Sequence, residues 1–351
     1  MNIQELLHQA LDLNASDVFI IAGLPVSYRI NGNVEITETD RLTPADTEAF
    51  ITQIYTDAKR SMDHFKATGD DDFSLSIHGF SRFRVNTFLQ RGSCSAVIRI
   101  IRFELPDPKK LGIPDSIMNL ADLTKGMVLV TGPAGSGKST TLACIIDRIN
   151  HTRACHIITL EDPIEFLHTH QKSIVSQREI SHDTESYVTA LRATLRQSPD
   201  IIQLGEMRDY ETISVAMTAA ETGHLLFSTL HTSGAANTIN RIIDVFPANQ
   251  QRQIIVQLST VLTAVVSQQL IPAIDGSLVL AYEVMTVTPA IRNLIRDNKV
   301  YQIDGMIYSS SGPDIISMDN CLLNLYNNGR ITKDTAITYA TNPDMLNRKL
   351  H

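Results

Sequence analysis

At residues 126–141 the chain reads GMVLVTGPAGSGKSTT. A continuous apolar run of strand type leads into the pattern G-x-x-x-x-G-K-S, and apolar residues then recur at helical spacing in residues 142–149. A phosphate-binding loop needs this order of strand, glycine-rich loop and helix. The alternative is a glycine-rich turn with an incidental lysine, which leaves the strand before it and the helix after it unexplained. The stretch therefore predicts nucleotide binding.

The residue types in this loop match the needs of a bound phosphate. Glycine lets the backbone curl so that several N–H groups point inward, and the helix that follows turns the positive end of its dipole towards the anion. Lys138 adds a positive charge for the β- and γ-phosphates, and the Ser139 hydroxyl is a hard oxygen ligand for Mg²⁺. The predicted nucleotide-binding residues of the loop are Gly132, Pro133, Ala134, Gly135, Ser136, Gly137, Lys138, Ser139 and Thr140.

The length and charge of the chain limit what it can do. At 351 residues it is long enough for two ordinary domains. Its net charge of −8 argues against wholesale electrostatic binding to nucleic acid, although a local basic face is compatible with it. The four cysteines are scattered without C-x-x-C spacing, which suits a reducing compartment and argues against a zinc ribbon. No apolar run reaches spanning length, so we expect a cytoplasmic protein without a transmembrane segment.

The sequence predicts an α/β protein of two domains. Residues 1–102 combine amphipathic helices with short alternating strands, which is typical of a small antiparallel sheet with helices. Residues 103–112 contain two prolines that prevent regular structure, so we place a linker there. Residues 113–351 then alternate strands and helices, as in a parallel sheet covered by helices. We expect the last quarter of the chain, from Pro247 on, to be largely helical.

Acidic side chains follow two of the predicted strands. Glu161, Asp162 and Glu165 come after one strand, and Glu206 comes after another. Ligands of an open α/β sheet bind at the carboxyl ends of the strands, where Mg²⁺ needs one or two carboxylates and an attacking water needs a base. Gly205 stands where an ordinary Walker B strand has Asp, so part of the metal coordination can fall to the first three acids. The alternative is that all four are solvated loop acids.

Two histidines bracket another predicted strand, with His224 before it and His231 after it. Their offset is odd, so they cannot share a face of a straight strand, and one of them must lie beyond its end. We assign His224 to nucleotide contact and His231 to the catalytic group. The competing interpretation is that either histidine is structural.

Three arginines lie on predicted strands of the N-terminal domain. Along residues 80–89, Arg82 and Arg84 share one face, and Arg99 lies on the neighbouring strand. Such a row is either a solvated sheet face or a set of guanidinium groups offered to a γ-phosphate, because a fixed planar donor fork stabilises charge that spreads in the transition state. Both interpretations stay open on the residues alone.

Four segments occur in an order that resembles the type II/type IV secretion ATPases. They read GPAGSGKST (residues 132–140), ITLEDPIEF (158–166), PDIIQLGEMRD (199–209) and ETGHLLFSTLHT (221–232). Residues 290–296, AIRNLIR, are similar to a signature of the type IV pilus retraction ATPases, the PilT family. The opening residues 16–34 and the RFRVN segment match the N-terminal domain of the same family, so the likeness covers nearly the whole chain.

The resemblance implies an architecture and a function. The fold would be a PAS-like α+β domain followed by a RecA-like P-loop ATPase domain with a helical C-terminal region. The protein would be a homohexamer, peripheral at the inner face of the cytoplasmic membrane, in which ATP turnover with Mg²⁺ drives disassembly of pilin subunits and hence pilus retraction and twitching motility. The implied partners are an inner-membrane pilus platform protein and a paralogous retraction ATPase, with no nucleic acid.

The resemblance also implies roles for single residues. Lys138 and Ser139 would hold phosphate and Mg²⁺, Glu165 would be the catalytic base, and Glu206 would support the metal and its water. In this family, arginines of the N-terminal domain reach the nucleotide. The matching residues are Arg82, Arg84 and Arg99.

One position departs from the family pattern, and several functions stay open. Gln203 occupies a Walker B position that is usually aliphatic, and a polar side chain in a core strand needs a partner. The sequence does not separate a primary retraction ATPase from an accessory one of the PilU type, or from a nucleotide-dependent regulatory module of the pilus or secretion machinery. Intact Lys138, Glu165 and Glu206 favour a hydrolysing motor. A DNA translocase would want a basic or aromatic surface, whereas this chain has no Trp and 6 % aromatic residues.

Overall fold

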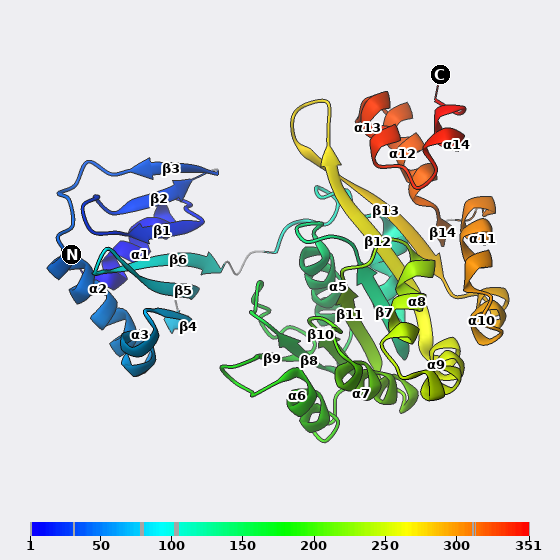
Figure 1. The fold of residues 1–351 in the computed structure, drawn as a ribbon, viewed down its shortest axis with the longest axis horizontal. Helices are drawn as coiled ribbons and strands as arrows, with labels where there is room; N and C mark the ends of the chain where they lie inside the picture. Colours follow the sequence, from blue (N-terminus) through cyan, green and yellow to red (C-terminus); the bar gives the residue numbers. More distant parts are fainter. Residues whose placement is uncertain are drawn as a thin grey trace. The chain divides into compact units, whose positions relative to one another are not determined.

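The computed structural model describes residues 2–30, 32–77, 81–101, 105–310, 312 and 314–350. The chain divides into two compact units, Met1–Glu104 and Leu105–His351, and each is described by itself (Figure 1). Both units mix helices with a β-sheet. Within the described ranges, no helix combines the length and the apolar character that crossing a bilayer requires.

The first unit is an antiparallel sheet with helices, as predicted. In the described part of the chain the sheet has six strands in the order β3-β2-β1-β6-β5-β4. Its elements are α1 (Ile3–Asp12), β1 (Asp17–Ile20), β2 (Ser27–Ile30), β3 (Asn33–Ile36), α2 (Pro44–Asp57), α3 (Asp63–Thr68), β4 (Asp70–Ile77), β5 (Ser81–Gln90) and β6 (Ser93–Ile101). Phe80, the first residue of the predicted arginine strand, and Arg102, the last residue of the predicted domain, lie outside the described residues.

Alternation along β5 divides the sheet of this unit into two faces. Phe83 and Val85 are fully buried and pack with apolar residues of α1 and α2 in one core. Arg84, on the opposite face of the strand, stands across from Arg99 of β6. The period of two therefore places the arginines on the face of the sheet that does not build the core.

The second unit is built on a mostly parallel sheet, whose strand order is β14-β13-β12-β7-β11-β10-β8-β9 in the described ranges (Figure 1). Strands β12, β7, β11, β10, β8 and β9 pair in parallel, and β13 and β14 are antiparallel additions. The strands are β7 (Gly126–Thr131), β8 (His156–Glu161), β9 (Ile174–Glu179), β10 (Ile201–Leu204), β11 (Leu225–Leu230), β12 (Leu262–Pro272), β13 (Leu278–Thr286) and β14 (Ile315–Ile316).

Helices cover both faces of this sheet. Those before β12 are α4 (Asp115–Met118), η1 (Asn119–Asp122), α5 (Lys138–Thr152), α6 (Tyr187–Thr194), α7 (Tyr210–Glu221), α8 (Ala235–Asp244) and α9 (Ala248–Val261). Those after β13 are α10 (Pro289–Arg296), η2 (Val300–Gln302), α11 (Ile303–Ser309), α12 (Met318–Asn327), α13 (Lys333–Thr338) and α14 (Pro343–Asn347).

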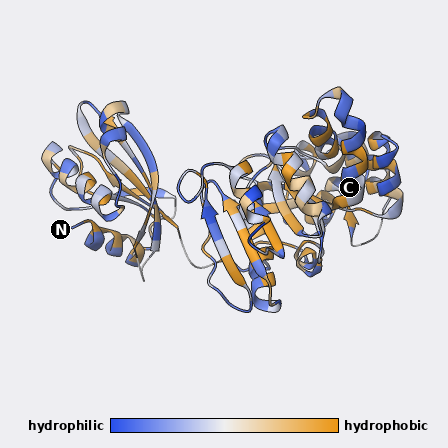
Figure 2. Ribbon diagram, turned by 90° about the horizontal axis from the view of Figure 1, so that it is seen from below, coloured by the Kyte–Doolittle hydropathy of each residue, from blue (hydrophilic) through white to orange (hydrophobic). Residues whose placement is uncertain are grey.

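Strand β7 is buried along its whole length, because it lies in the middle of the sheet with helices on both sides. Val128 and Val130 face the core that includes α5, whereas Met127 and Leu129 face the core that includes α6 to α9. A strand that is buried on both faces reads as a continuous apolar run, which is what the sequence shows. Figure 2 shows hydrophobic residues concentrated in the central strands of the sheet.

The prediction that the chain is largely helical from Pro247 on is wrong for residues 262–286. Two long strands, β12 and β13, form there, and β12 pairs with β7. The sequence of β12, LTAVVSQQLIP, follows α9 without a glycine or proline between them, so the helical pattern runs into the strand without a break. Burial beside β7 then favours its β-branched residues in extended form. Among the described residues from Pro289 on, the regular elements other than β14 are helices.

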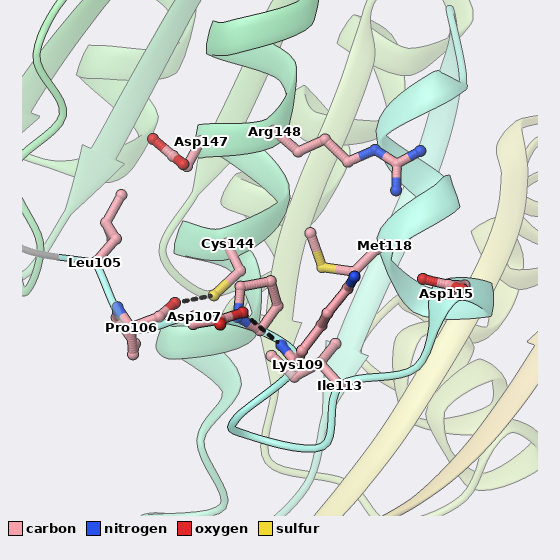
Figure 3. Close-up of a pocket in the computed structure, with 11 residues that line it drawn as sticks. Leu105, Pro106, Asp107, Lys109, Ile113, Asp115, Met118, Cys144, Asp147 and Arg148 are labelled. Carbon is pink, nitrogen blue, oxygen red and sulfur yellow. Dashed lines mark hydrogen bonds between the residues drawn. The ribbon is translucent and has the colours of Figure 1, made fainter.

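The predicted linker at residues 103–112 is described from Leu105 on, and Phe103 and Glu104 lie outside the described residues. Residues from Leu105 belong to the second unit, where the Cys144 thiol of α5 donates to the Pro106 carbonyl oxygen at 3.5 Å. A cavity of about 340 Å³ lies between this segment and α5 (Figure 3). Burial raises the pKa of Cys144 to about 11, so its thiol stays protonated at neutral pH.

Candidate nucleotide site

The parallel register brings the predicted motifs to one edge of the sheet. Strand β7 ends opposite the end of β11, and β10 pairs residue by residue with β8. The glycine-rich loop, the acidic segment after β8, Glu206 after β10 and His231 after β11 therefore leave the sheet at the same carboxyl edge. This is the edge at which α/β sheets bind ligands.

The loop after β7 has room only for glycine at its first position. Gly132 has φ +140°, and a Cβ there would lie 2.2 Å from the carbonyl oxygen of Gln268 and 2.8 Å from the Ser136 hydroxyl oxygen. Gly137, with φ +85°, immediately precedes α5. The Lys138 ammonium donates to the carbonyl oxygens of Gly132 and Pro133 at 2.9 and 2.8 Å. The loop thus curls around the start of α5, with its lysine folded over it.

Gln268 of β12 supports this loop, and sequence reasoning missed it. Its side chain is fully buried, and its Nε2 donates to the Ser136 carbonyl oxygen at 2.7 Å. A buried amide needs a partner, and the polar pair in the apolar run of β12 was the available signal. Because the sequence predicts a helix for that run, it does not place Gln268 beside the loop.

A cavity of about 270 Å³ opens beside the loop. Its lining residues are Ala134, Gly135, Lys138, Ser139, Leu142, Glu161, Asp162, Pro163, Glu165, Tyr187, Gln203, Gly205, Glu206, Arg208, Thr229 and His231. Lysine, hydroxyl, carboxylate and imidazole groups thus meet in one place. The other predicted loop residues are Gly132, Pro133, Ser136, Gly137 and Thr140, which belong to the same loop and first helical turn without lining the cavity.

Glu206 lies at the centre of the charged groups of the cavity. One of its oxygens is 2.5 Å from Arg208, and the other is 3.3 Å from Nε2 of His231. Burial lowers the pKa of Lys138, and the charges of Glu206 and Glu165 oppose that shift. The lysine therefore lies within the electrostatic reach of both predicted acids.

Packing explains why Gly205 replaces the usual Walker B aspartate. A Cβ at this position would lie 2.6 Å from the Tyr187 hydroxyl oxygen and 3.1 Å from the Leu160 carbonyl oxygen. The Thr229 hydroxyl donates to the Gly205 carbonyl oxygen at 2.6 Å, which fixes the backbone there. Tyr187, Thr229 and Arg208 complete the cavity. Sequence reasoning does not name them as site residues, although Arg208 and Thr229 lie in the segments 199–209 and 221–232.

The acids after β8 have different environments. Glu161 is buried, and it accepts hydrogen bonds from the Thr159 hydroxyl at 2.6 Å and from Gln177 Nε2 at 3.2 Å. Burial raises the pKa of Glu161 to about 7, although these hydrogen bonds favour its charged form. Glu165 is exposed, in a segment without regular structure. Of the two glutamates, Glu165 has the accessible carboxylate.

The structure does not bring His224, which we assign to nucleotide contact, to this cavity. Its Nδ1 lies 3.0 Å from the Ala219 carbonyl oxygen, and its own carbonyl oxygen accepts a hydrogen bond from the Gly126 N–H at the start of β7. It therefore lies at the amino end of β11, about 20 Å along the strand from the carboxyl edge at ~3.3 Å per residue. His231 is the histidine of the pair beyond the carboxyl end of the strand, as the odd offset required of one of them.

The three predicted arginines lie on β5 and β6 of the first unit. Arg84 forms an ion pair with Asp72 at 2.6 Å, and Arg99 donates to Asp17 at 3.1 Å. Arg82 is half-buried two residues before Arg84. The Arg99 side chain is 68 % exposed, so its guanidinium is accessible in spite of its ion pair. These contacts fit the solvated-face interpretation and leave the interpretation of a γ-phosphate contact untested.

A buried parallel strand, a glycine-rich loop with lysine and serine, and acids at the neighbouring strand ends define a P-loop nucleotide-binding protein. The sequence model of the type II/IV secretion system protein family matches residues 1–279. The chain belongs to this family.

Relatives of known name match over nearly the whole chain. The chain is 44 % identical over 344 residues to the type IV pilus retraction ATPase PilT of Pseudomonas aeruginosa, an alignment that covers 98 % of this chain and 99 % of the relative. It is 38 % identical to the type IV pilus ATPase PilU of the same organism, with coverage of 97 % and 89 %. A crystal structure of the pilus retraction motor PilT with bound ADP superposes with a TM-score of 0.91 at 46 % identity, and covers 99 % of each chain.

Proposed function

We propose that this chain is an ATP-hydrolysing motor that powers retraction of type IV pili and thereby twitching motility. The protein is an ATPase of the type II/IV secretion family. The observation that carries the proposal is the meeting of Lys138, Ser139, Glu165, Glu206 and His231 in one cavity. The proposal that hydrolysis powers pilus retraction rests on the similarity of the chain to the retraction ATPase PilT over almost the full length of that protein.

The donor groups of the cavity fit a nucleotide with Mg²⁺. The curled loop offers backbone N–H groups to phosphate, and Lys138 offers a charge. The Ser139 hydroxyl and the Glu206 carboxylate line the same cavity and are the hard oxygen groups that would hold the metal. The ion supplies charge neutralisation at the phosphates when it is bound. Glu206 would then exchange part of its contact with Arg208 and His231 for the metal site.

Glu165 is the residue that we assign to the attacking water. Its carboxylate is exposed at the cavity, whereas that of Glu161 is buried and already accepts two hydrogen bonds. A base must reach the proton that it removes, so accessibility decides between the two. His231 lies against Glu206 and would orient that carboxylate as the charge in the site changes.

The arginines of the N-terminal domain support assembly of several copies of the chain, because they could reach a nucleotide that a neighbouring copy binds. We place a PAS-like domain at residues 1–102, a linker at 103–112 and a RecA-like domain at 113–351. Arg82, Arg84 and Arg99 would approach a nucleotide from the PAS-like domain of the same or a neighbouring chain. A head-to-tail interface that closes makes a ring, and the resemblance to the family implies that the ring has six copies. Light scattering at micromolar concentration with nucleotide should give six copies, and a monomer with full ATPase activity would exclude this assembly.

The motor would act at the inner face of the cytoplasmic membrane, on an inner-membrane pilus platform protein. An accessory role beside a paralogous retraction ATPase is the second candidate, because the chain is also 38 % identical to PilU. In a strain that lacks this protein, the wild-type chain should restore twitching and the Lys138→Ala variant should not. Unimpaired twitching in the deletion strain would refute the primary role, and restoration only when the paralogue is present would assign the accessory role.

A further inference from the structure

The segment of residues 162–168 carries Glu165 between β8 and β9 without forming a helix or a strand. Side chains of β9 bind its backbone at three points. The Ile164 N–H donates to Glu179 Oε2 at 3.1 Å, and the His168 N–H donates to Gln177 Oε1 at 2.8 Å. Gln177 Nε2 donates to the Phe166 carbonyl oxygen at 2.8 Å. The backbone is therefore held one residue before Glu165 and again one and three residues after it.

Strand geometry brings these groups together. Gln177 and Glu179 are two residues apart on β9, so they share a face. Their partners in the parallel register of β8 are Thr159 and Glu161. Glu161 Oε1 accepts from both Thr159 Oγ1 and Gln177 Nε2, at 2.6 and 3.2 Å. Thus Gln177 links the segment that carries Glu165 to the buried carboxylate at the end of β8.

The chemistry of the amide explains why glutamine occupies this position. A primary amide has both a donor and an acceptor, so one side chain can bind a backbone C=O and a backbone N–H together. A glutamate at 177 would keep the acceptor for His168 but would present a second acceptor to Phe166 and Glu161. An apolar residue would leave three polar groups of a partly buried site without this partner, which is costly.

We propose that Gln177 is a positioning residue for ATP hydrolysis: it holds residues 162–168 so that the Glu165 carboxylate stays in the nucleotide cavity. The inference rests on the proposed role of Glu165. It does not involve Lys138 or Ser139, which lie in the first turn of α5 after the glycine-rich loop. Loss of Gln177 should therefore slow the chemical step and spare nucleotide binding.

The test uses Gln177→Met, which keeps the length of the side chain and removes its hydrogen-bonding groups. Steady-state ATPase activity gives kcat and KM, and a fluorescent ATP analogue gives Kd. We expect kcat to fall about 10- to 100-fold, because a misplacement of about 1 Å costs up to ~10²-fold, with Kd within about twofold of wild type. The matched control is Gln171→Met, an exposed glutamine whose amide donates to Thr169 in the same connection. Its kcat should not change.

A second background separates positioning from general damage. If Gln177 acts through Glu165, Gln177→Met should add no further loss of kcat to a Glu165→Gln protein. An equal loss in both backgrounds, or a kcat of Gln177→Met within twofold of wild type, would overturn the proposal. If Glu165→Gln alone keeps normal turnover, the proposed role of Glu165 fails, and that result is read without any change at Gln177.

A conservative variant covers the case in which Gln177→Met does not fold. Gln177→Asn keeps the amide on a shorter side chain, which cannot reach Phe166 and His168 together. A folded Gln177→Asn protein, judged by its melting curve, should show a reduced kcat with Kd preserved. Normal kcat in this variant would also overturn the proposal.

Discussion

The fit of Gly205 against Tyr187 can be tested by adding a single methyl group. A Cβ at residue 205 would lie 2.6 Å from the Tyr187 hydroxyl oxygen and 3.4 Å from Cζ of the same ring, with the Leu160 carbonyl oxygen at 3.1 Å. Ring and strand must therefore separate in Gly205→Ala. Overpacking costs about 1–3 kcal/mol, which in a unit of this size corresponds to a fall in Tm of about 3–9 °C.

The tyrosine hydroxyl is the atom in closest conflict, so its removal should restore stability. In Gly205→Ala/Tyr187→Phe the nearest ring atom is left at 3.4 Å, an ordinary contact distance. We expect the double variant to regain most of the lost Tm, with a coupling free energy of about 1 kcal/mol or more by a double-mutant cycle. The control is Gly305→Ala, a helical glycine with nothing within 4 Å of its Cβ, which should melt as wild type or slightly higher. A wild-type Tm for Gly205→Ala, or additive effects in the double variant, would refute the packing argument.

Three further predictions concern chemistry, pH and mechanical coupling. Glu165→Gln should bind ATP but lose about 10²–10⁴-fold in kcat, whereas Lys138→Ala should weaken binding itself; near-normal turnover or tight binding, respectively, would contradict the assignments. Burial raises the pKa of Glu161 to about 7 in the folded protein, so its contribution to the free energy of unfolding falls as pH rises from about 4.5 to 7. Glu161→Gln should gain Tm relative to wild type over that range, and parallel pH curves would count against it. Helix α10 contains the AIRNLIR segment, and its Arg296 is exposed, so we expect this arginine to contact a partner of the motor rather than the nucleotide site. Arg296→Ala should keep ATPase activity within a few-fold of wild type but abolish twitching. Wild-type twitching by this variant would show that Arg296 does not couple ATP hydrolysis to retraction.

The buried strands of the second unit could be predicted, because a strand that is buried on both faces has a continuous run of apolar residues in the sequence. Strand β7 lies between β11 and β12, and all six of its residues are buried. The loop that follows it could be recognised because each of its residue types has a physical reason. The acids at residues 161–165 and at Glu206 could be placed at the same edge, because carboxyl ends of parallel strands coincide.

The elements that were missed have weaker local signals. Strand β9 reads IVSQRE, in which polar residues replace the apolar pattern. Strand β12 directly follows α9, with no glycine or proline to mark the end of the helix. Strand β9 forms because it pairs with β8, and β12 forms because it pairs with β7. The local sequence does not show either pairing. The two histidines are a different case, because the sequence already places His224 before the strand and His231 after it. Since ligands of an α/β sheet bind at the carboxyl ends of the strands, that order alone favours His231 over His224 as the residue of the site.

Polar residues inside buried strands can indicate where a strand supports the site, and an analysis of apolar patterns alone does not use them. Gln268 holds the phosphate loop from β12, and Gln177 holds the acidic segment from β9. Gln203 of β10 lines the same cavity, yet its amide oxygen is buried without a hydrogen-bond partner among the described residues. The Gln268 amide oxygen is also buried without a hydrogen-bond partner in the described part of the chain, but its Nε2 binds the loop, whereas no such bond offsets the cost at Gln203. A buried polar group without a partner costs about 1–3 kcal/mol. Gln203 therefore costs stability in the nucleotide-free protein unless a ligand of the cavity supplies the missing donor, and that cost is a reason why aliphatic residues usually occupy such a strand.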